Sequence, residues 1–511
     1  MSLTSLLLTP FIGALLILLV PGNYRVIVRL IALVTTAITA ISAIALFAAF
    51  KPGVADFQFE HQAAWIPAAG LSYHVGVDGL NIGLVLMASL VAFAATCVSW
   101  DIERQPKLFY LLLLLMTGGA IGAFVSLDLF FLYFFNELAL VPTFLMMGLW
   151  GRGEQKNYAT FQITLYLTLG ALVALTGLVA LYALSGANTL DIVTLRTWLA
   201  EKPLTGQAQA LIFPLLLFGF GTLVGLWPFH SWAAPGYAAA PTATAMMHSG
   251  VLKKVGLYAL IRVALPLLPD GLVHWTPVIA WLCLGNILYC GWVAMRQRDL
   301  ALLLGNSSLA HMGFCFLGLA SVSVIGVTGV VVIMVAHGLL AAVSFGLLGH
   351  LVKVTGTSDM DKLGGLLRPL PFIGAALVAA LMAGCGLPGF ANFPGEITVM
   401  FGAWKTLPGF VVVAAWGGLL IGGVYMLRAI RTVLHGPVKA EFAKAEDANC
   451  WRKLPFLVLL GALIYFGVNP GSLVERIKPA VAEVVKAASA KSPAAQPAAS
   501  APTATAMNTA H

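Results

Sequence analysis

Long apolar segments recur along almost the whole chain. They are bounded by charged residues or by Gly and Pro clusters and lie at 3–20, 26–50, 76–99, 108–124, 127–150, 160–185, 211–233, 241–265, 272–295, 301–320, 324–352, 371–404, 408–434 and 454–468. Helices of this length cross a hydrocarbon core of about 30 Å, whereas the strands of a membrane barrel would alternate in polarity. The pattern therefore predicts an all-α polytopic membrane protein with about 14 transmembrane helices.

Helix-breaking residues interrupt two of these spans. Pro228 lies within GLWPFHSW in the seventh span, and Gly386, Pro388, Gly389 and Pro394 lie within GCGLPGFANFPGE in the twelfth. Backbone groups freed at membrane depth need polar partners other than lipid. Either site alone is consistent with a simple Pro kink. Breaks at corresponding positions of two halves favour two inverted five-helix repeats, with broken helices 7 and 12, around an ion site at the membrane midplane.

This reading divides the chain into five regions. We expect helices 1–3 in residues 1–100, the first repeat with helices 4–8 in 101–265, and the second repeat with helices 9–13 in 266–435. Residues 436–484 are expected to form a loop and helix 14. Residues 485–511 are rich in Ala, Pro, Ser and Thr, and this composition predicts a disordered tail.

Composition agrees with a bilayer environment and gives no sign of a redox centre. The 511 residues are 60% hydrophobic and 9% charged, with a mean hydropathy of +0.94, which a water-soluble domain of this length would not tolerate. The six cysteines form no C-x-x-C pair, and neither a dinucleotide-binding nor a P-loop motif is present. We therefore expect no cofactor or metal site in this chain.

The net charge of +8 comes from Lys and Arg that gather in the loops on one predicted side. The loops of the other side hold few cations, among them Lys51, Arg196 and Lys202. Cytoplasmic loops of membrane proteins are rich in Lys and Arg, so both termini should face away from the cytoplasm. The residues on the basic side are Arg25, Arg29, Arg104, Lys107, Arg152, Lys156, Arg296, Arg298, Lys353, Lys362, Arg368, Arg428, Arg431, Lys439, Lys444, Arg452 and Lys453.

Three residues with charged side chains lie away from the ends of the fifth and eighth spans. Glu137 belongs to the fifth, and Lys253 and Lys254 lie midway along the eighth, too far from either end for both to reach the headgroups. Each charge there costs about 2.5–3.5 kcal/mol on insertion scales, which makes a functional role the default interpretation. A structural ion pair or a hydrogen-bonded carboxylic acid is the alternative for Glu137. The two lysines lie about 100° apart on a helix, so one can serve structure while the other titrates.

Further titratable groups continue this series towards the twelfth span. His311 and His337 lie in two spans between Lys254 and Glu396, and histidine titrates near neutral pH. An intramembrane histidine is often only hydrogen-bonded to a hydroxyl or carbonyl, and Glu396 can instead cap backbone N–H groups freed by the break. The ordered set nevertheless indicates a proton relay. Its members are Glu137, Lys254, His311, His337 and Glu396, with Lys253, His248 and His230 as further candidates.

Several motifs surround these residues. They read YHVGVDGLN from Tyr73, SLDLFFLYFFNELALVPTFLMMGLWG from Ser126, WPFHSW from Trp227, APTATAMMHSGVLKKVGLYALIR from Ala240, and then SSLAHMGF, VAHGLLAA and GLPGFANFPGE. To about residue 468 the chain resembles the proton-translocating subunits of respiratory complex I, which are related to Mrp-type cation/proton antiporters. Its length and ending fit the antiporter-like M-type (chain 4) members, because the longest members carry an additional lateral helix.

The resemblance implies residue roles as well as a fold. Glu137 matches the acidic residue of the fifth span, Lys254 the central lysine of the eighth, and Glu396 the terminal acid of the broken twelfth. His311 and His337 match the connecting histidines. The implied activity is proton pumping, coupled to NADH:quinone electron transfer in other subunits.

The resemblance also implies partners and a location. FMN, iron–sulfur clusters and quinone would be held by partner subunits, namely the peripheral redox arm and the membrane domain with its L-type and N-type members. The membrane would be the bacterial inner (plasma) membrane, and no nucleic acid is expected. A subunit of a multisubunit cation/proton antiporter is the alternative, and a scaffold that has lost conduction is a third hypothesis.

Two positions depart from the family pattern. A lysine usually stands seven residues before the histidine of the P-[FL]-H motif in the seventh span, but this chain has Leu223 there. The basic pair that commonly follows the aspartate before the tenth span is replaced by Ala301 and Leu302 after Asp299. The chain therefore lacks the usual partner of Glu137.

Another cation has to approach Glu137 if this acid still exchanges protons. Our first choice is Lys253, because at about 100° from Lys254 it can face the first half while its neighbour faces the second. We therefore expect the Lys253 ammonium to lie nearer to Glu137 than His230 does. If it does not, Glu137 is better interpreted as a protonated structural acid.

Overall fold

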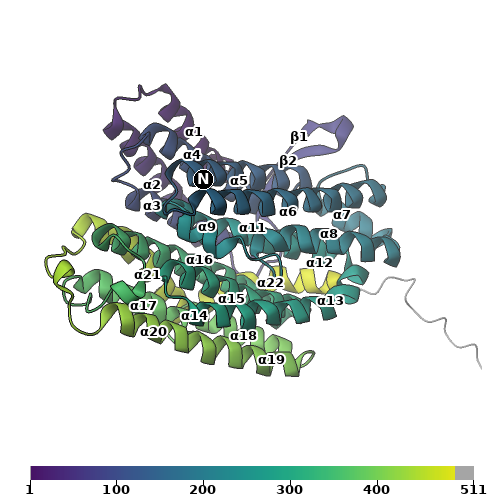
Figure 1. Ribbon diagram of the computed structural model, residues 1–511. Coiled ribbons are helices and arrows are strands. Elements are labelled where there is room, and N and C mark those ends of the chain that lie inside the picture. The colour runs from purple at the N-terminus through teal and green to yellow at the C-terminus, as the bar shows by residue number, and fades with distance from the viewer. Residues whose placement is uncertain (1, 490–511) are drawn as a thin grey trace, which may run out of the picture.

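Helices account for most of the computed structural model, which describes residues 2–489 (Figure 1). Within these residues, ten helices are long and apolar enough to cross a membrane. Three shorter helices are also apolar: Leu3–Leu19, Ile82–Val98 and Pro371–Gly384. These features confirm an all-α polytopic membrane protein. The count of fourteen spans stays a prediction, because several of the predicted spans are built from more than one helix.

The first part of the chain forms six helices that follow the predicted apolar runs. They are α1 (Leu3–Leu19), α2 (Arg25–Ala49), α3 (Ile82–Val98), α4 (Pro106–Val125), α5 (Leu129–Trp150) and α6 (Lys156–Ser185). The predicted span 76–99 began before the observed helix α3, which starts at Ile82. Its first residues belong to a two-stranded antiparallel hairpin of β1 (Gln58–Ile66) and β2 (Leu71–Val77), which projects from the bundle (Figure 1).

The seventh predicted span is broken, as expected. After the short amphipathic helix α7 (Ile192–Glu201), the helix α8 (Gly206–Val224) ends at Gly225, whose φ of 87° favours glycine. The chain becomes helical again in α9 (Ala233–Ala239). The side chain of Asn286 satisfies the interrupted backbone: it accepts from the Trp227 N–H at 2.8 Å and donates to the Gly225 carbonyl at 2.8 Å.

The following helices contain single π-helical turns, labelled η like the short 3-10 turns. The eighth span consists of α10 (Thr242–Met247), η2 (His248–Leu252), α11 (Lys253–Ala259), η3 (Leu260–Ala264) and α12 (Leu265–Leu267). The ninth consists of α13 (Pro269–Leu284), η4 (Gly285–Cys290) and α14 (Gly291–Arg296). These turns change the helical register, which a regular 3.6-residue period does not anticipate.

The second half is centred on α15 (Leu300–Ala320) and α16 (Val324–Thr355), which are almost entirely buried. The second break separates α17 (Pro371–Gly384) from α18 (Asn392–Trp404), and Gly386 and Gly389 adopt positive φ there. The Ala391 N–H in this break donates to the Leu463 carbonyl. The remaining helices are α19 (Pro408–Ala415), η6 (Trp416–Ile421), α20 (Gly422–Leu434) and α21 (Cys450–Val468).

The prediction of a disordered tail is wrong for residues 485–489. An amphipathic helix, α22 (Gly471–Ser489), continues past residue 485. Its apolar face includes Leu473, Ile477, Val481 and Val484, at spacings of three or four residues, and it packs against α16 and α12. The tail prediction for residues 490–511 lies outside the described residues.

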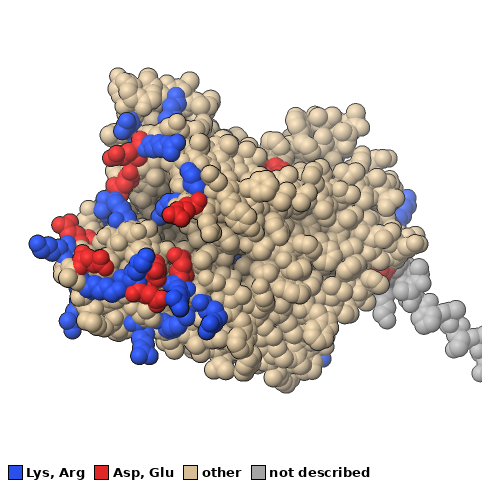
Figure 2. All heavy atoms as spheres, in the orientation of Figure 1, with Lys and Arg blue, Asp and Glu red and all other residues tan. Residues whose placement is uncertain are grey.

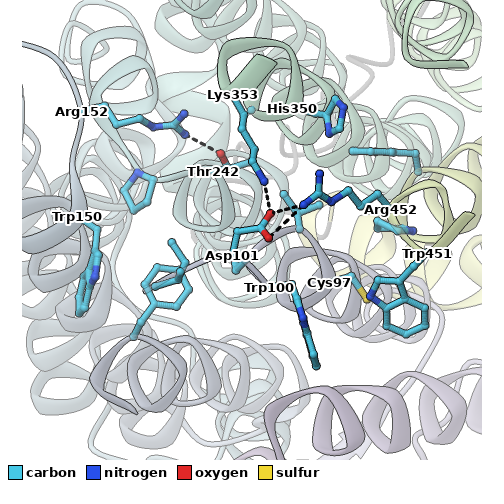
Figure 3. A pocket seen from close by; sticks show the side chains of 18 residues that line it. Cys97, Trp100, Asp101, Trp150, Arg152, Thr242, His350, Lys353, Trp451 and Arg452 are labelled. Atoms are coloured by element: carbon cyan, nitrogen blue, oxygen red, sulfur yellow. Dashed lines mark hydrogen bonds and ion pairs between the residues drawn. The ribbon is translucent and has the colours of Figure 1, made fainter. Parts of the chain in front are cut away.

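Charged side chains gather at one end of the bundle, opposite the hairpin (Figures 1 and 2). We call this the charged end and define it by Asp101, Arg152, Arg298, Lys353 and Arg452. It includes a hollow of about 360 Å³ in which Lys353 of α16 and Arg452 of α21 both bind Asp101 (Figure 3). Partial burial favours a raised pKa for Asp101, but the two cations hold its pKa below the usual range. The carboxylate thereby joins the ends of three helices.

Candidate functional site

Lys254 lies at the start of α11, directly after the π-helical turn η2. Its Nζ donates to the Ser249 carbonyl at 2.5 Å and lies 2.9 Å from Nδ1 of His337 on α16. The two side chains are 0% and 2% exposed. A protonated lysine has only donors, so Nδ1 of His337 accepts when Lys254 is charged. The central lysine therefore points inward at a titratable partner rather than at lipid.

His311 and Glu396 extend this arrangement. The rings of His337 and His311 lie 5.3 Å apart between centroids. Nδ1 of His311 lies 2.7 Å from the Ser307 carbonyl, and its Nε2 lies 3.2 Å from the Gly384 carbonyl and 3.5 Å from Oε1 of Glu396. Both ring nitrogens thus face acceptors, so the nitrogen that carries a proton can donate it to a carbonyl or a carboxylate.

The break before α18 makes room for the Glu396 carboxylate. A Cβ atom at Gly386 would lie 2.8 Å from Oε2 of Glu396. The positive φ of Gly386 and its missing side chain therefore both belong to the site. The second broken helix positions an acid as well as interrupting the backbone.

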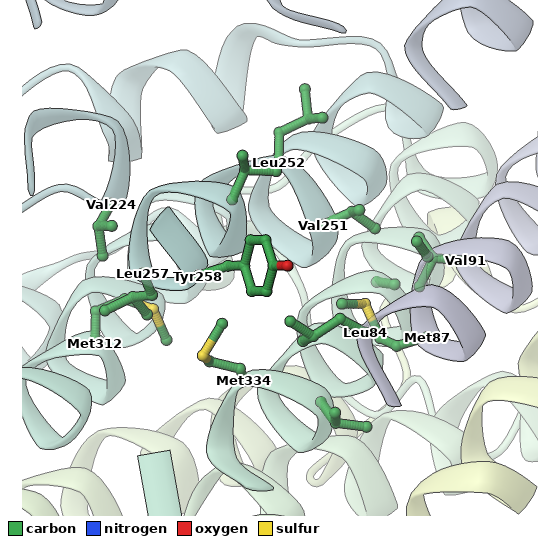
Figure 4. Close-up of a cluster of buried hydrophobic side chains, with 14 of the residues drawn as sticks. Leu84, Met87, Val91, Val224, Val251, Leu252, Leu257, Tyr258, Met312 and Met334 are labelled. Carbon is green, nitrogen blue, oxygen red and sulfur yellow. The ribbon is translucent and has the colours of Figure 1, made fainter. Parts of the chain in front are cut away.

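Apolar side chains surround the helical turn η2, which directly precedes Lys253 and Lys254. Figure 4 shows Leu84, Met87 and Val91 of α3 beside Val251 and Leu252 of η2, with Met334 of α16 on another side. All of them are nearly or fully buried. This packing leaves polar contacts available to the lysines mainly towards α15 and α16, which confines charge to one side of the segment.

Lys253 forms no ion pair with Glu137 among the described residues, and the expectation that it faces the first half was wrong. Its Nζ donates to the Ser308 hydroxyl at 2.5 Å and to the Ser308 carbonyl at 3.3 Å, and it lies 5.7 Å from the centre of the Tyr237 ring. Both lysines therefore contact the second half. The two side chains reach different helices, but both of these helices, α15 with Ser308 and α16 with His337, belong to the second half.

Glu137 stands apart from the other candidates. It receives one hydrogen bond, from Nδ2 of Asn136 at 3.2 Å, and forms no ion pair within residues 2–489. It lies on the same face of α5 as Phe134 and Val141, which are 43% and 51% exposed. Leu223 is buried instead beside Asn136 and Tyr133. Among the described residues, Glu137 therefore has no hydrogen bond or ion pair with Lys253, Lys254, His311 or His337.

The two further histidine candidates also lie outside the series. His248 is buried against the rings of Trp232 and Tyr237, and in the described part of the chain neither of its ring nitrogens has a hydrogen-bond partner. His230 packs against the Tyr289 ring. The described residues hold no cluster of three or more His, Cys, Asp or Glu side chains that would suit a metal ion.

Several polar groups of the site were missed in the sequence. Ser307 and Ser308, within SSLAHMGF, bind His311 and Lys253, and the Tyr425 hydroxyl donates to the Ser307 hydroxyl at 3.1 Å. The two adjacent serines about one helical turn before His311 could have indicated these polar groups from the sequence. The backbone carbonyl acceptors at Ser249 and Gly384 carry no signal in the sequence.

Comparison with known proteins shows the family of this chain. Residues 126–422 match the family described as NADH:quinone oxidoreductase/Mrp antiporter, TM. The chain belongs to this family. It is 33% identical over 478 residues to NAD(P)H-quinone oxidoreductase chain 4 1 of Picosynechococcus sp., covering 92% of this chain and 89% of that protein. It is 34% identical over 458 residues to NADH-quinone oxidoreductase subunit M of Pseudomonas aeruginosa, covering 86% and 89%.

A solved structure supports the same assignment. The chain matches one chain of respiratory complex I from Thermus thermophilus with bound NADH, at a TM-score of 0.87 and 28% identity, covering 96% of this chain and 100% of that chain. Membership of the NADH:quinone oxidoreductase/Mrp antiporter family thus confirms the resemblance seen in the motifs. The roles of the individual residues stay predictions.

Proposed function

We propose that this chain is the M-type membrane subunit of a proton-pumping NADH:quinone oxidoreductase and that protons move through it along Lys254, His337, His311 and Glu396. The observation that carries the proposal is the contact of Lys254 Nζ with His337 Nδ1, in line with His311 and Glu396. Burying four titratable groups from four helices together costs free energy. Such residues inside a membrane are therefore interpreted as functional by default. Electron transfer takes place in other subunits.

Proton movement needs only short steps along this line. Lys254 passes a proton directly to Nδ1 of His337 across 2.9 Å. The two histidine rings are too far apart for a direct hydrogen bond, but a cavity of about 20 Å³ touches both, enough space for one bridging water. His311 then releases a proton from Nε2 to the Glu396 carboxylate, 3.5 Å away. Each step moves one proton and leaves the donor ready to be reloaded.

The remaining assignments follow from the same proposal. The charged end is the cytoplasmic side of a bacterial inner membrane, with both termini on the other side. FMN, iron–sulfur clusters and quinone belong to partner subunits, and L-type and N-type subunits are the membrane neighbours. The two broken segments mark two inverted repeats, in residues 101–265 and 266–435.

Purification of the complex through a tag on this chain tests the proposal. We expect flavin and iron–sulfur absorbance to copurify with the chain, and NADH oxidation by the reconstituted complex to drive proton uptake into liposomes. The variant Lys254→Met should lower that uptake. A complex that pumps at the full wild-type rate with Lys254→Met would overturn the proposed route.

A subunit of a multisubunit cation/proton antiporter is the second candidate, because the family includes Mrp antiporters. The two candidates differ in what copurifies. A complex without flavin or iron–sulfur absorbance that exchanges Na⁺ for protons across liposomes would support the antiporter and reject the oxidoreductase.

A further inference from the structure

Two cavities share Phe345 as a lining residue. The outer cavity, of about 650 Å³, lies at the charged end, and exposed residues such as Glu154 and Gly356 are on its lining. The inner cavity, of about 20 Å³, is lined by His311 and His337 of the proposed proton route and by Ser308. Phe345 of α16 is the one described residue that lines both.

The Phe345 ring is held by a second aromatic ring. Its centre lies 5.6 Å from that of Tyr237 in an edge-on arrangement, and only 3% of Phe345 is exposed. Tyr237 also lines the outer cavity. Two aromatic rings therefore form the partition between a surface-connected space and the buried polar line.

The groups behind the partition are those that a proton would reach first. Ser308 lines the inner cavity and accepts a hydrogen bond from Lys253, while His311 and His337 line the same space. An apolar constriction between two hydrated spaces blocks a water chain by dewetting, and its displacement restores that chain. The inner cavity has space for about one water, and a water chain from the outer cavity would have to pass the Phe345 side chain that lines both.

We propose that Phe345 is the gate through which protons from the charged end reach Lys253, Ser308 and the two histidines. With its ring in the observed position the two cavities are separate, and when the ring swings away a water chain joins them. The inference rests on the proposed proton-pumping function. It also gives Lys253 a role beside the gate, as the first basic group behind it.

Neighbouring residues on α16 provide matched controls. Leu348 lines only the outer cavity, and Leu340 lines only the inner cavity. Leu348→Ala and Leu340→Ala each enlarge one cavity without removing the partition, whereas Phe345→Ala removes it. All three substitutions shorten a buried apolar side chain, so a general loss of packing would affect them alike.

Thiol labelling measures the partition without relying on pumping. Ser344 lines only the inner cavity, and Ser344→Cys places a thiol there with little change in size. In the purified complex, we expect a small charged methanethiosulfonate reagent to label Ser344→Cys at least about tenfold faster with Phe345→Ala than with native Phe345. Leu348→Ala should not accelerate labelling. The same complex with native Ser344 corrects for the natural cysteines.

Proton flux gives the second readout. In liposomes, Phe345→Ala should raise resting proton permeability and lower the protons taken up per NADH, whereas Leu348→Ala and Leu340→Ala should not. Phe345→Leu should give an intermediate effect, and it replaces the alanine variant if that variant fails to assemble. Equal labelling with and without the Phe345 ring would overturn the gate. Full pumping with Lys254→Met would instead overturn the proposed function, whatever the labelling result.

Discussion

Nζ of Lys254 lies 2.9 Å from Nδ1 of His337, within direct proton-transfer distance, although the two residues are on different helices and far apart in the sequence. The lysine lies beside a π-helical turn and the histidine in the middle of the most central helix. The partner on the other side of Lys254 is a backbone carbonyl, which does not take up a proton. In the proposed route, His337 is therefore the group to which Lys254 passes its proton.

We expect Lys254→Met to lower proton pumping and NADH:quinone turnover by at least about tenfold, because a general acid or base commonly contributes at least that much. The complex should still assemble, since Met fills a similar volume. Lys254→Arg is the matched control: it keeps the positive charge but does not release a proton, and it should fail in the same way. Near-normal pumping with Arg would show that only the charge matters. Turnover and proton uptake in liposomes are the measurements.

Glu396→Gln should also impair pumping while leaving assembly intact. The change preserves the shape of the side chain 3.5 Å from His311 but removes its capacity to take a proton. Glu483→Gln removes an exposed carboxylate from α22 and should have no effect. Proton uptake per NADH is the quantity to compare. If the Glu396→Gln complex assembles and pumps as the wild type does, Glu396 is a capping group and not a proton carrier.

The hairpin should dock less firmly as pH rises. His74 of β2 lies between Asp191, the N-cap of α7, and Glu60 of β1. Burial favours a lowered pKa for His74, but hydrogen bonds and charges from the two carboxylates raise it. A raised folded-state pKa means that this stabilisation is complete below the unfolded value of about 6.5 and is lost as pH rises through the folded value.

Hydrogen exchange in β2 and α7 checks this pH dependence. After correction for intrinsic rates, protection should fall as pH rises above the unfolded pKa of about 6.5 in the wild type. His74→Gln should remove the dependence, because an amide does not titrate in this range. Protection that rises with pH in the wild type would contradict the proposed ion pairs.

Asp78 and Arg262 form a clamp whose loss should reduce assembly. Arg262 donates to the two carboxylate oxygens at 2.6 and 2.8 Å and to the Tyr258 hydroxyl at 3.1 Å, and both ionic side chains are buried. Removing one partner leaves an unpaired buried charge, which costs about 3–5 kcal/mol. Arg262→Met should therefore lower the amount and thermal stability of the complex. Adding Asp78→Leu should recover part of the loss, and further destabilisation by the double variant would argue against a paired clamp.

Much of the fold was predictable because membrane helices leave a strong signal. Long apolar runs located the helices, and clustered Gly and Pro located both breaks. The hairpin and α22 were missed, because their polar–apolar alternation and amphipathic spacing are weak beside twenty-residue apolar runs. Asn286 was missed because nothing in the sequence links it to the distant backbone that it satisfies.

The residue types of the site were predictable from the sequence, but the directions and contacts of their side chains were less so. Buried Lys, His and Glu are unusual enough in apolar spans to be recognised individually. The direction of Lys253 was not predictable, since it depends on which helices flank the segment and not on the residue type. Phe345 carried no signal, because one more aromatic residue in an apolar helix is unremarkable until the two cavities that it lines are known.

The turn η2 also constrains which changes in length this helix tolerates. A π-helical turn holds one more residue than an α-helical turn, so deleting one residue from 248–252 leaves a regular α-helical turn. Deleting one residue from α10 instead rotates the part of the helix before the deletion against the part after it by about 100°. Lys253 and Lys254 would then turn away from Ser308 and His337 without any change in their own identity. Deletions are normally tolerated in loops at little cost. In this segment the place of a deletion, and not only its length, decides whether the two lysines still face Ser308 and His337.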